Sequence, residues 1–126
     1  MLDSRKIGIV FGGVFIVVGL LGFIPNPLVS PHGVFAVNLA HNLVHILTGV
    51  IFIILVMRFK DKEDVVIKSL GAVYMVVAVI GFFTTGDKLL GFVHINDADR
   101  WLHFGLAVAI IGAGFLFKPT QSRVST

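Results

Sequence analysis

The sequence predicts an all-α integral membrane protein, a bundle of four transmembrane helices. Hydrophobic residues make up 56% of the 126 residues and charged residues only 13%, which is typical of neither a disordered chain nor a water-soluble domain. The apolar residues are gathered into four segments, and each is near the roughly 17–25 residues that a helix needs to cross a bilayer. The length fits a single four-helix domain over residues 1–126.

Lys68 is the single Lys, Arg, Asp or Glu within the four expected spans. These spans are Ile7–Ile24, Val34–Met57, Val65–Phe83 and Trp101–Phe117. Helices satisfy their own backbone hydrogen bonds, so lipid favours them over short open strands. The first span ends at prolines with no cleavage signature of small residues, and we interpret it as a retained helix rather than a signal peptide. We expect no internal repeat, because the polar motifs of the two halves differ.

The distribution of Lys and Arg predicts the orientation. One side of the expected topology holds Arg5, Lys6, Arg58, Lys60, Lys62, Lys68, Lys118 and Arg123, and the other holds Lys88 and Arg100. By the positive-inside rule, both termini and the second loop are cytoplasmic. We therefore expect a multi-pass protein of the cell membrane whose main partner is the lipid bilayer. The net charge of +3 then reflects this asymmetry and does not indicate a nucleic-acid partner.

A polar stripe marks the second span. At about 100° per residue, Asn38, His41, Asn42 and His45 fall within one arc of roughly 120°. Such a face is costly in lipid and must meet protein or water. At the start of the fourth helix, Asp99 and His103 stand at positions i and i+4 and share one helix face. We expect the two faces to meet in the outer half of the membrane, with Asn38, Asn42 and Asp99 in the resulting polar cluster.

Two interpretations of this cluster remain open. The first is a hydrogen-bond network that joins the helices, at about 0.6 kcal/mol per contact. In that case the protein has a non-enzymatic, unassigned role. The second is a metal site in which His41, His45 and His103 are the ligands, because imidazoles without sulfur ligands suit zinc, or iron or copper less specifically. The chain has no cysteine, so thiolate and iron–sulfur sites are excluded. A haem held between facing histidines is a variant of the second interpretation.

Enzymatic and transport functions receive less support. The H-x-x-x-H spacing lacks the Glu of a metalloprotease motif, and no phosphate-binding loop is present. A small transporter or proton-handling protein is a further alternative, but the stripe ends near Gly49 and leaves the inner half without a titratable relay. The sequence leaves open whether the protein forms a homo-oligomer.

Three motifs carry a resemblance to a known family. They are Asn38-x-x-His41-Asn42-x-x-His45-x-x-x-Gly49, Gly71-x-x-Tyr74 and Asn96-x-x-Asp99-x-x-Leu102-His103. In these the chain resembles a family of small, uncharacterised bacterial four-helix membrane proteins that is catalogued only as a domain of unknown function. The resemblance implies a four-helix inner-membrane protein. It brings no activity, ligand or catalytic residue.

Overall fold

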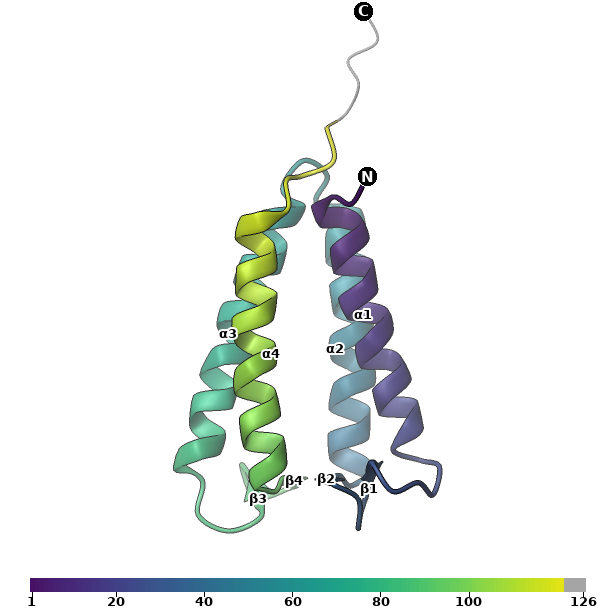
Figure 1. The fold of residues 1–126 in the computed structure, drawn as a ribbon, viewed down its shortest axis with the longest axis vertical. Coiled ribbons are helices and arrows are strands. Elements are labelled where there is room, and N and C mark those ends of the chain that lie inside the picture. The colour runs from purple at the N-terminus through teal and green to yellow at the C-terminus, as the bar shows by residue number, and fades with distance from the viewer. Residues whose placement is uncertain (122–126) are drawn as a thin grey trace, which may run out of the picture.

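The chain folds into two helical hairpins that stand side by side. The computed structural model describes residues 1–121, and Figure 1 shows the four helices running between two ends of the molecule. They are α1 (Ser4–Leu21), α2 (Leu39–Arg58), α3 (Glu63–Phe83) and α4 (Asp97–Leu116). All four are long and apolar enough to cross a membrane. The architecture is therefore all-α and fits a multi-pass membrane protein that contacts lipid.

The helices do not begin where the apolar runs begin. The helix α2 starts at Leu39 rather than Val34, because Asn38 is its N-cap and accepts a hydrogen bond from the His41 backbone N–H. In the same way α4 starts at Asp97 rather than Trp101, behind a capping box of Asn96 and Asp99. Side-chain oxygens that satisfy the first free N–H groups thus set the start of these helices, whatever the hydropathy of the first turn.

The helix α1 shows the same effect at the opposite end of the molecule. It covers Ser4–Leu21 rather than Ile7–Ile24, because Asp3 caps it and accepts a hydrogen bond from the Lys6 backbone N–H. This hydrogen bond lowers the pKa of the Asp3 carboxyl group. The polar residues that precede the first apolar run are therefore part of the helix.

Two short strand pairs, which the sequence analysis did not anticipate, join the helices within each hairpin. Strand β1 (Val29–Ser30) pairs in parallel with β2 (Phe35–Ala36), and β3 (Lys88–Leu89) pairs antiparallel with β4 (Val93–His94). Each loop crosses to the other hairpin, since β2 packs on α4 and β4 packs on α2. The two loops therefore bind the hairpins together at the end of the bundle away from the chain termini (Figure 1).

The two hairpins are copies of one another, which corrects our expectation of no repeat. A shift of 59 residues (Ser4 to Glu63) aligns four of the five buried positions of α1 with buried positions of α3, and a shift of 58 (His41 to Asp99) aligns four of the six buried positions of α2 with buried positions of α4. Identical residues at equivalent positions include Gly12/Gly71, Val14/Val73, Gly22/Gly81, Phe23/Phe82, Asn38/Asn96 and His45/His103. The copies agree in glycines and apolar residues and differ in most polar ones, so a comparison of polar motifs misses the repeat.

Reciprocal hydrogen bonds between the loops confirm this relation. Asn38 Nδ2 donates to the backbone oxygen of Phe92 at 2.8 Å, and Asn96 Nδ2 donates to the backbone oxygen of Val34 at 2.9 Å. Each N-cap asparagine therefore bonds the residue that lies four positions before the other one. Because α1 and α3 start at the same end, the copies form a parallel repeat, whose axis lies along the membrane normal when the helices span a bilayer.

Close helix contact within the first hairpin depends on glycine. A Cβ atom added at Gly12 would lie 2.7 Å from the backbone oxygen of Gly49, and one added at Gly19 would lie 2.8 Å from that of Asn42. Small residues let membrane helices approach closely where no hydrophobic driving force exists between them. Between the hairpins, the core consists of Phe15, Phe52, Val56, Ile67 and Ile110.

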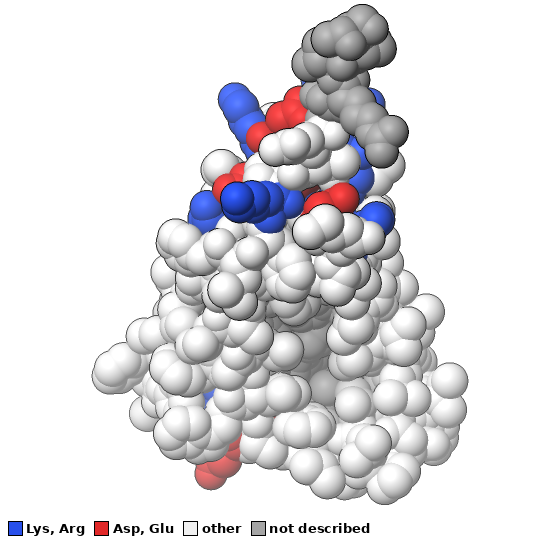
Figure 2. All heavy atoms as spheres, turned by 45° about the horizontal axis from the view of Figure 1, so that its top comes forward, with Lys and Arg blue, Asp and Glu red and all other residues white. Residues whose placement is uncertain are grey.

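Charge is concentrated at the end of the molecule that carries both termini. Figure 2 shows most of the Lys, Arg, Asp and Glu side chains of one face gathered there, above a largely uncharged flank and a smaller acidic patch at the opposite end. At this end Arg5 pairs with Glu63 at 2.7 Å, and the Glu63 side chain is fully buried. The Ser4 hydroxyl donates to the backbone oxygen of Phe117 at 2.6 Å. These bonds join the start of α1 to the second hairpin.

Candidate metal centre

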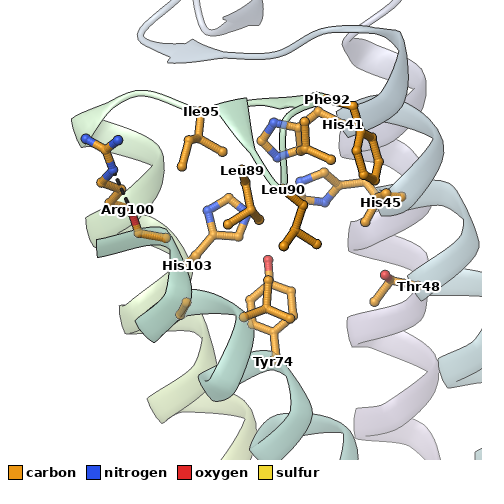
Figure 3. Close-up of a pocket in the computed structure, with 15 residues that line it drawn as sticks. His41, His45, Thr48, Tyr74, Leu89, Leu90, Phe92, Ile95, Arg100 and His103 are labelled. Carbon is orange, nitrogen blue, oxygen red and sulfur yellow. Dashed lines mark hydrogen bonds between the residues drawn. The ribbon is translucent and has the colours of Figure 1, made fainter. Parts of the chain in front are cut away.

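Three histidines from two helices converge between the hairpins. His41 and His45 extend from α2 and His103 from α4, and their candidate ligand atoms all lie within 4.8 Å of one another. The ring centroids are 4.8 Å apart for His41 and His45, 5.4 Å for His41 and His103, and 5.7 Å for His45 and His103. Figure 3 shows the three rings grouped around one space. The fold thus brings together the three residues that the sequence singled out.

The repeat explains this convergence. His45 and His103 occupy equivalent positions in the two hairpins, so the repeat axis that relates α2 to α4 places them opposite each other. His41 lies one turn before His45 on the same face of α2. Its equivalent in α4 is Asp99, which is used in the capping box. The repeat therefore supplies a pair of facing imidazoles, and His41 adds a third from one side only.

Backbone carbonyls fix the tautomers of two rings. His41 Nδ1 lies 2.6 Å from the backbone oxygen of His94, and His103 Nδ1 lies 2.5 Å from that of Asp99. A carbonyl oxygen only accepts, so in both rings Nδ1 carries the proton and Nε2 is left with a free lone pair. Metal-bound histidines show this same arrangement, in which the outer nitrogen donates to a carbonyl or carboxylate.

The third ring and a tyrosine lack hydrogen-bond partners. His45 Nδ1 and the hydroxyl of Tyr74 are both buried, and neither has a partner among residues 1–121. A hydrogen-bond network between the helices would satisfy such groups, because leaving one unpaired costs about 1–3 kcal/mol. The three imidazoles make no hydrogen bond with one another within this described range either. Both unpaired groups lie beside the three-histidine cluster and are therefore available to a ligand bound there.

Tyr74 of α3 is a site residue that residue-by-residue reasoning missed. Its ring stacks on His103 at a centroid distance of 5.5 Å and packs edge-on against Phe15, its equivalent in the repeat, at 5.3 Å. In Figure 3 its hydroxyl points toward the histidine rings. The sequence signal that could have identified Tyr74 is that it is the single tyrosine of the chain and lies in the middle of the third apolar span.

A cavity of about 200 Å³ adjoins the histidines (Figure 3). Its walls are mainly aliphatic and aromatic, and they contain no Asp or Glu. The lining residues beside the histidines and Tyr74 are Val44, Thr48, Val77, Ala78, Gly81, Leu89, Leu90, Phe92, Val93, Ile95 and Arg100. The Arg100 guanidinium is occupied elsewhere, because it donates to the backbone oxygens of Gly81 and Gly86 and pairs with Asp97. It stabilises the C-terminal end of α3.

The three residues that we expected in one polar cluster have different roles. They are Asn38, Asn42 and Asp99. Asn38 is the α2 cap, and its Oδ1 also accepts the His94 backbone N–H at 3.2 Å. The Asp99 carboxylate accepts the Asn96 backbone N–H at 2.9 Å. Both hold the loops under which the histidines lie. Asn42 does not join the histidines, because it packs against Gly22 of α1 and lines a separate groove.

These features define a class: a four-helix candidate membrane protein in which a cluster of three histidines, two buried and one half-buried, lies between two repeated hairpins. Residues 5–116 match the model of DUF4383, a domain of unknown function, and the chain belongs to this family. No curated protein and no solved structure matches the chain. The family description names no activity or ligand, so any function must be argued from the geometry of the histidine cluster.

Proposed function

We propose that this protein is a multi-pass membrane protein that binds one divalent metal ion, with zinc as the best candidate, through His41, His45 and His103. The observation that carries the proposal is the hydrogen bonding of the ring nitrogens in the three imidazoles. Two of them have Nδ1 bound to a carbonyl, which leaves Nε2 free, and the third has a buried nitrogen without a partner. Three neutral imidazoles with an open fourth position are a known zinc ligand set.

The size of the cavity weighs against the haem alternative. Sites for drug-sized ligands and cofactors are clefts of roughly 300–1,000 Å³, and the cavity here has about 200 Å³. Iron and copper also bind imidazole, so the ligand set alone does not separate them from zinc. The absence of cysteine from the chain disfavours the softer metals that select thiolate.

The three histidines would leave the fourth position of the proposed metal without a protein ligand, and the cavity that they line has no Asp or Glu in its wall to fill it. Three histidines with one position left for water or substrate are the pattern of a catalytic or ligand-binding zinc, whereas structural zinc sites are closed by four protein ligands. We therefore infer that the site binds an external ligand. Its reaction, if it has one, is not assigned.

The metal content of protein purified without an affinity tag tests the proposal. We expect about one zinc ion per chain, and we expect it to be lost in His41→Ala, His45→Ala and His103→Ala because each removes one of three ligands. His32→Ala is the matched control, since His32 is exposed and lies outside the cluster, and it should retain the metal. An unmetallated parent that also fails to take up Zn²⁺ or Co²⁺ would refute the site, and a Soret band would replace it with haem.

We further infer the orientation from the Lys and Arg asymmetry. Both termini and the loop between α2 and α3 face the cytoplasm of a bacterial cell, and the two strand-bearing loops face outward. The histidine cluster then lies in the outer leaflet, within the first two turns of α2 and α4. Two helix N-termini and two C-termini meet at this end, so their dipoles largely offset each other and do not repel a cation.

A further inference from the structure

The cavity beside the histidines is lined by partly exposed residues of α2 and α3. Val44 of α2 and Val77 of α3 both line it, and their exposed fractions are 45% and 38%. Both residues lie within candidate membrane spans. On the loop side, Leu89, Leu90 and Phe92 of the β3–β4 region cover the cavity, as Figure 3 shows. An opening between these two valines would give a molecule dissolved in the bilayer a lateral route to the histidines.

The two copies of the repeat differ in the polar side chains that they place beside the cavity. Thr48 and Tyr74 line the cavity on the α2–α3 side. Their equivalents in the other copy are Leu106 and Phe15, which carry no polar side-chain atom. In each of these two pairs of equivalent positions, therefore, only one residue has a hydroxyl group that can bond a ligand. Tyr74 supplies the clearest case, because its hydroxyl is buried and has no partner among the described residues.

Size and charge indicate the kind of ligand. An apolar cavity of about 150 Å³ holds one benzene molecule, so about 200 Å³ accommodates a single substituted ring. Rings of three histidines, Tyr74 and Phe92 line the space, and aromatic side chains pack favourably on aromatic ligands. A doubly charged ion on three neutral imidazoles has no carboxylate in the cavity wall to offset it. A ligand that binds as an anion is favoured for this reason.

We propose that the open position takes the hydroxyl oxygen of a lipid-soluble phenol or quinol. Its ring occupies the cavity, and its apolar chain leaves between Val44 and Val77 into the bilayer. On binding, the hydroxyl proton is released to the aqueous buffer and the oxygen coordinates the metal as an anion. Tyr74 donates its hydroxyl hydrogen to that oxygen. This inference rests on the proposed metal site and adds its ligand class and route of access.

The test uses Co²⁺, whose visible spectrum reports its ligands, in the full chain reconstituted in lipid nanodiscs. Co²⁺ uptake of about one ion per chain is measured first. 4-Hexylphenol and the water-soluble anion azide are then added to the Co²⁺ form in separate titrations. We expect 4-hexylphenol to shift the Co²⁺ bands at a lower concentration than azide. Val77→Trp places a large side chain in the proposed lateral opening. This variant should bind Co²⁺ normally, but its affinity for 4-hexylphenol should be at least tenfold lower than that of the parent.

Val76→Trp is the matched control. It makes the same substitution on the same helix at a residue that is 59% exposed and does not line the cavity, so it should behave like the parent. Normal Co²⁺ binding with no response to 4-hexylphenol, or equal affinity in parent and Val77→Trp, would overturn the phenol inference and leave the metal site intact. Failure of the parent to bind Co²⁺ would overturn both.

Discussion

At the scale of single residues, polar side chains in this fold act through backbone groups as much as through one another. Asn38 and Asn96 each cap a helix and bond a loop of the other copy. His41 and His103 donate to carbonyl oxygens. Two of the buried side-chain atoms that these contacts leave unpaired, His45 Nδ1 and the Tyr74 hydroxyl, lie at the candidate site.

Tyr74→Phe tests the role of the unpaired phenol hydroxyl. Phe is already the residue at the equivalent position 15, so the fold accommodates the ring. Removing a buried, unpaired hydroxyl should make the metal-free protein more stable by about 1 kcal/mol, measured by thermal unfolding in detergent. The same change should weaken 4-hexylphenol binding to the Co²⁺ form. Phe15→Tyr is the control and should destabilise; a loss of stability in metal-free Tyr74→Phe would show that the hydroxyl is already paired.

At the scale of helices, each hairpin is stabilised by close backbone contact at small residues. The α1–α2 pair depends on glycine on both sides of its interface, at Gly12 and Gly49. In the second hairpin the equivalent interface has Gly71 of α3 against Ile111 of α4. The hairpins then meet each other through larger side chains, including Phe15 and Phe52. The pair of facing histidines lies between hairpins, where helix packing is less close.

Gly12→Ala tests the close packing of α1 on α2. The added Cβ would lie 2.6 Å from Ile53 Cγ1 and 2.7 Å from the Gly49 backbone oxygen, so the helices must separate. We expect a loss of about 1–3 kcal/mol, measured by thermal unfolding in detergent. Gly13→Ala is the control, because nothing lies within 4 Å of its added Cβ, and it should be neutral or stabilising. Equal effects of the two substitutions would contradict the interface.

At the scale of the whole molecule, the parallel repeat accounts for the position of the site. Transport proteins built from repeats place binding sites at the interface between the copies, and the three-histidine cluster here occupies that interface. Differences between the copies, rather than their identities, supply His41 and Tyr74. One face of a nearly symmetric bundle thereby acquires a set of polar atoms that the other face lacks.

The orientation of the bundle is tested with single cysteines in this cysteine-free chain. His32→Cys lies in the loop before α2, and Lys60→Cys lies between α2 and α3; both positions are exposed. With both termini inside, a membrane-impermeant maleimide should label His32→Cys in intact cells. Lys60→Cys should be labelled only after permeabilisation, because positive loops remain cytoplasmic. The reverse pattern would invert the topology and place the histidines in the inner leaflet.

Much of the architecture could be predicted from the sequence because hydropathy over a span is a sum of local contributions. The four helices follow from the lengths of the apolar runs, and His41 and His45 share a face because of helix periodicity alone. The predicted start of α2 at Val34 was wrong, because the Asn38 cap sets the first residue of this helix and the apolar character of the preceding residues does not. The repeat was overlooked because glycine and valine identities are weak signals within segments that are all apolar.

The sequence by itself therefore determined the class of protein, the number of helices and the identity of the three histidines. Only the tertiary structure decided that His103 meets the α2 pair, that Tyr74 joins them and that Asn42 does not. Which helix faces meet, and which polar atoms stay unpaired, depends on packing between segments far apart in the chain. Local periodicity fixes the face on which a residue lies but does not specify the partner that this face contacts.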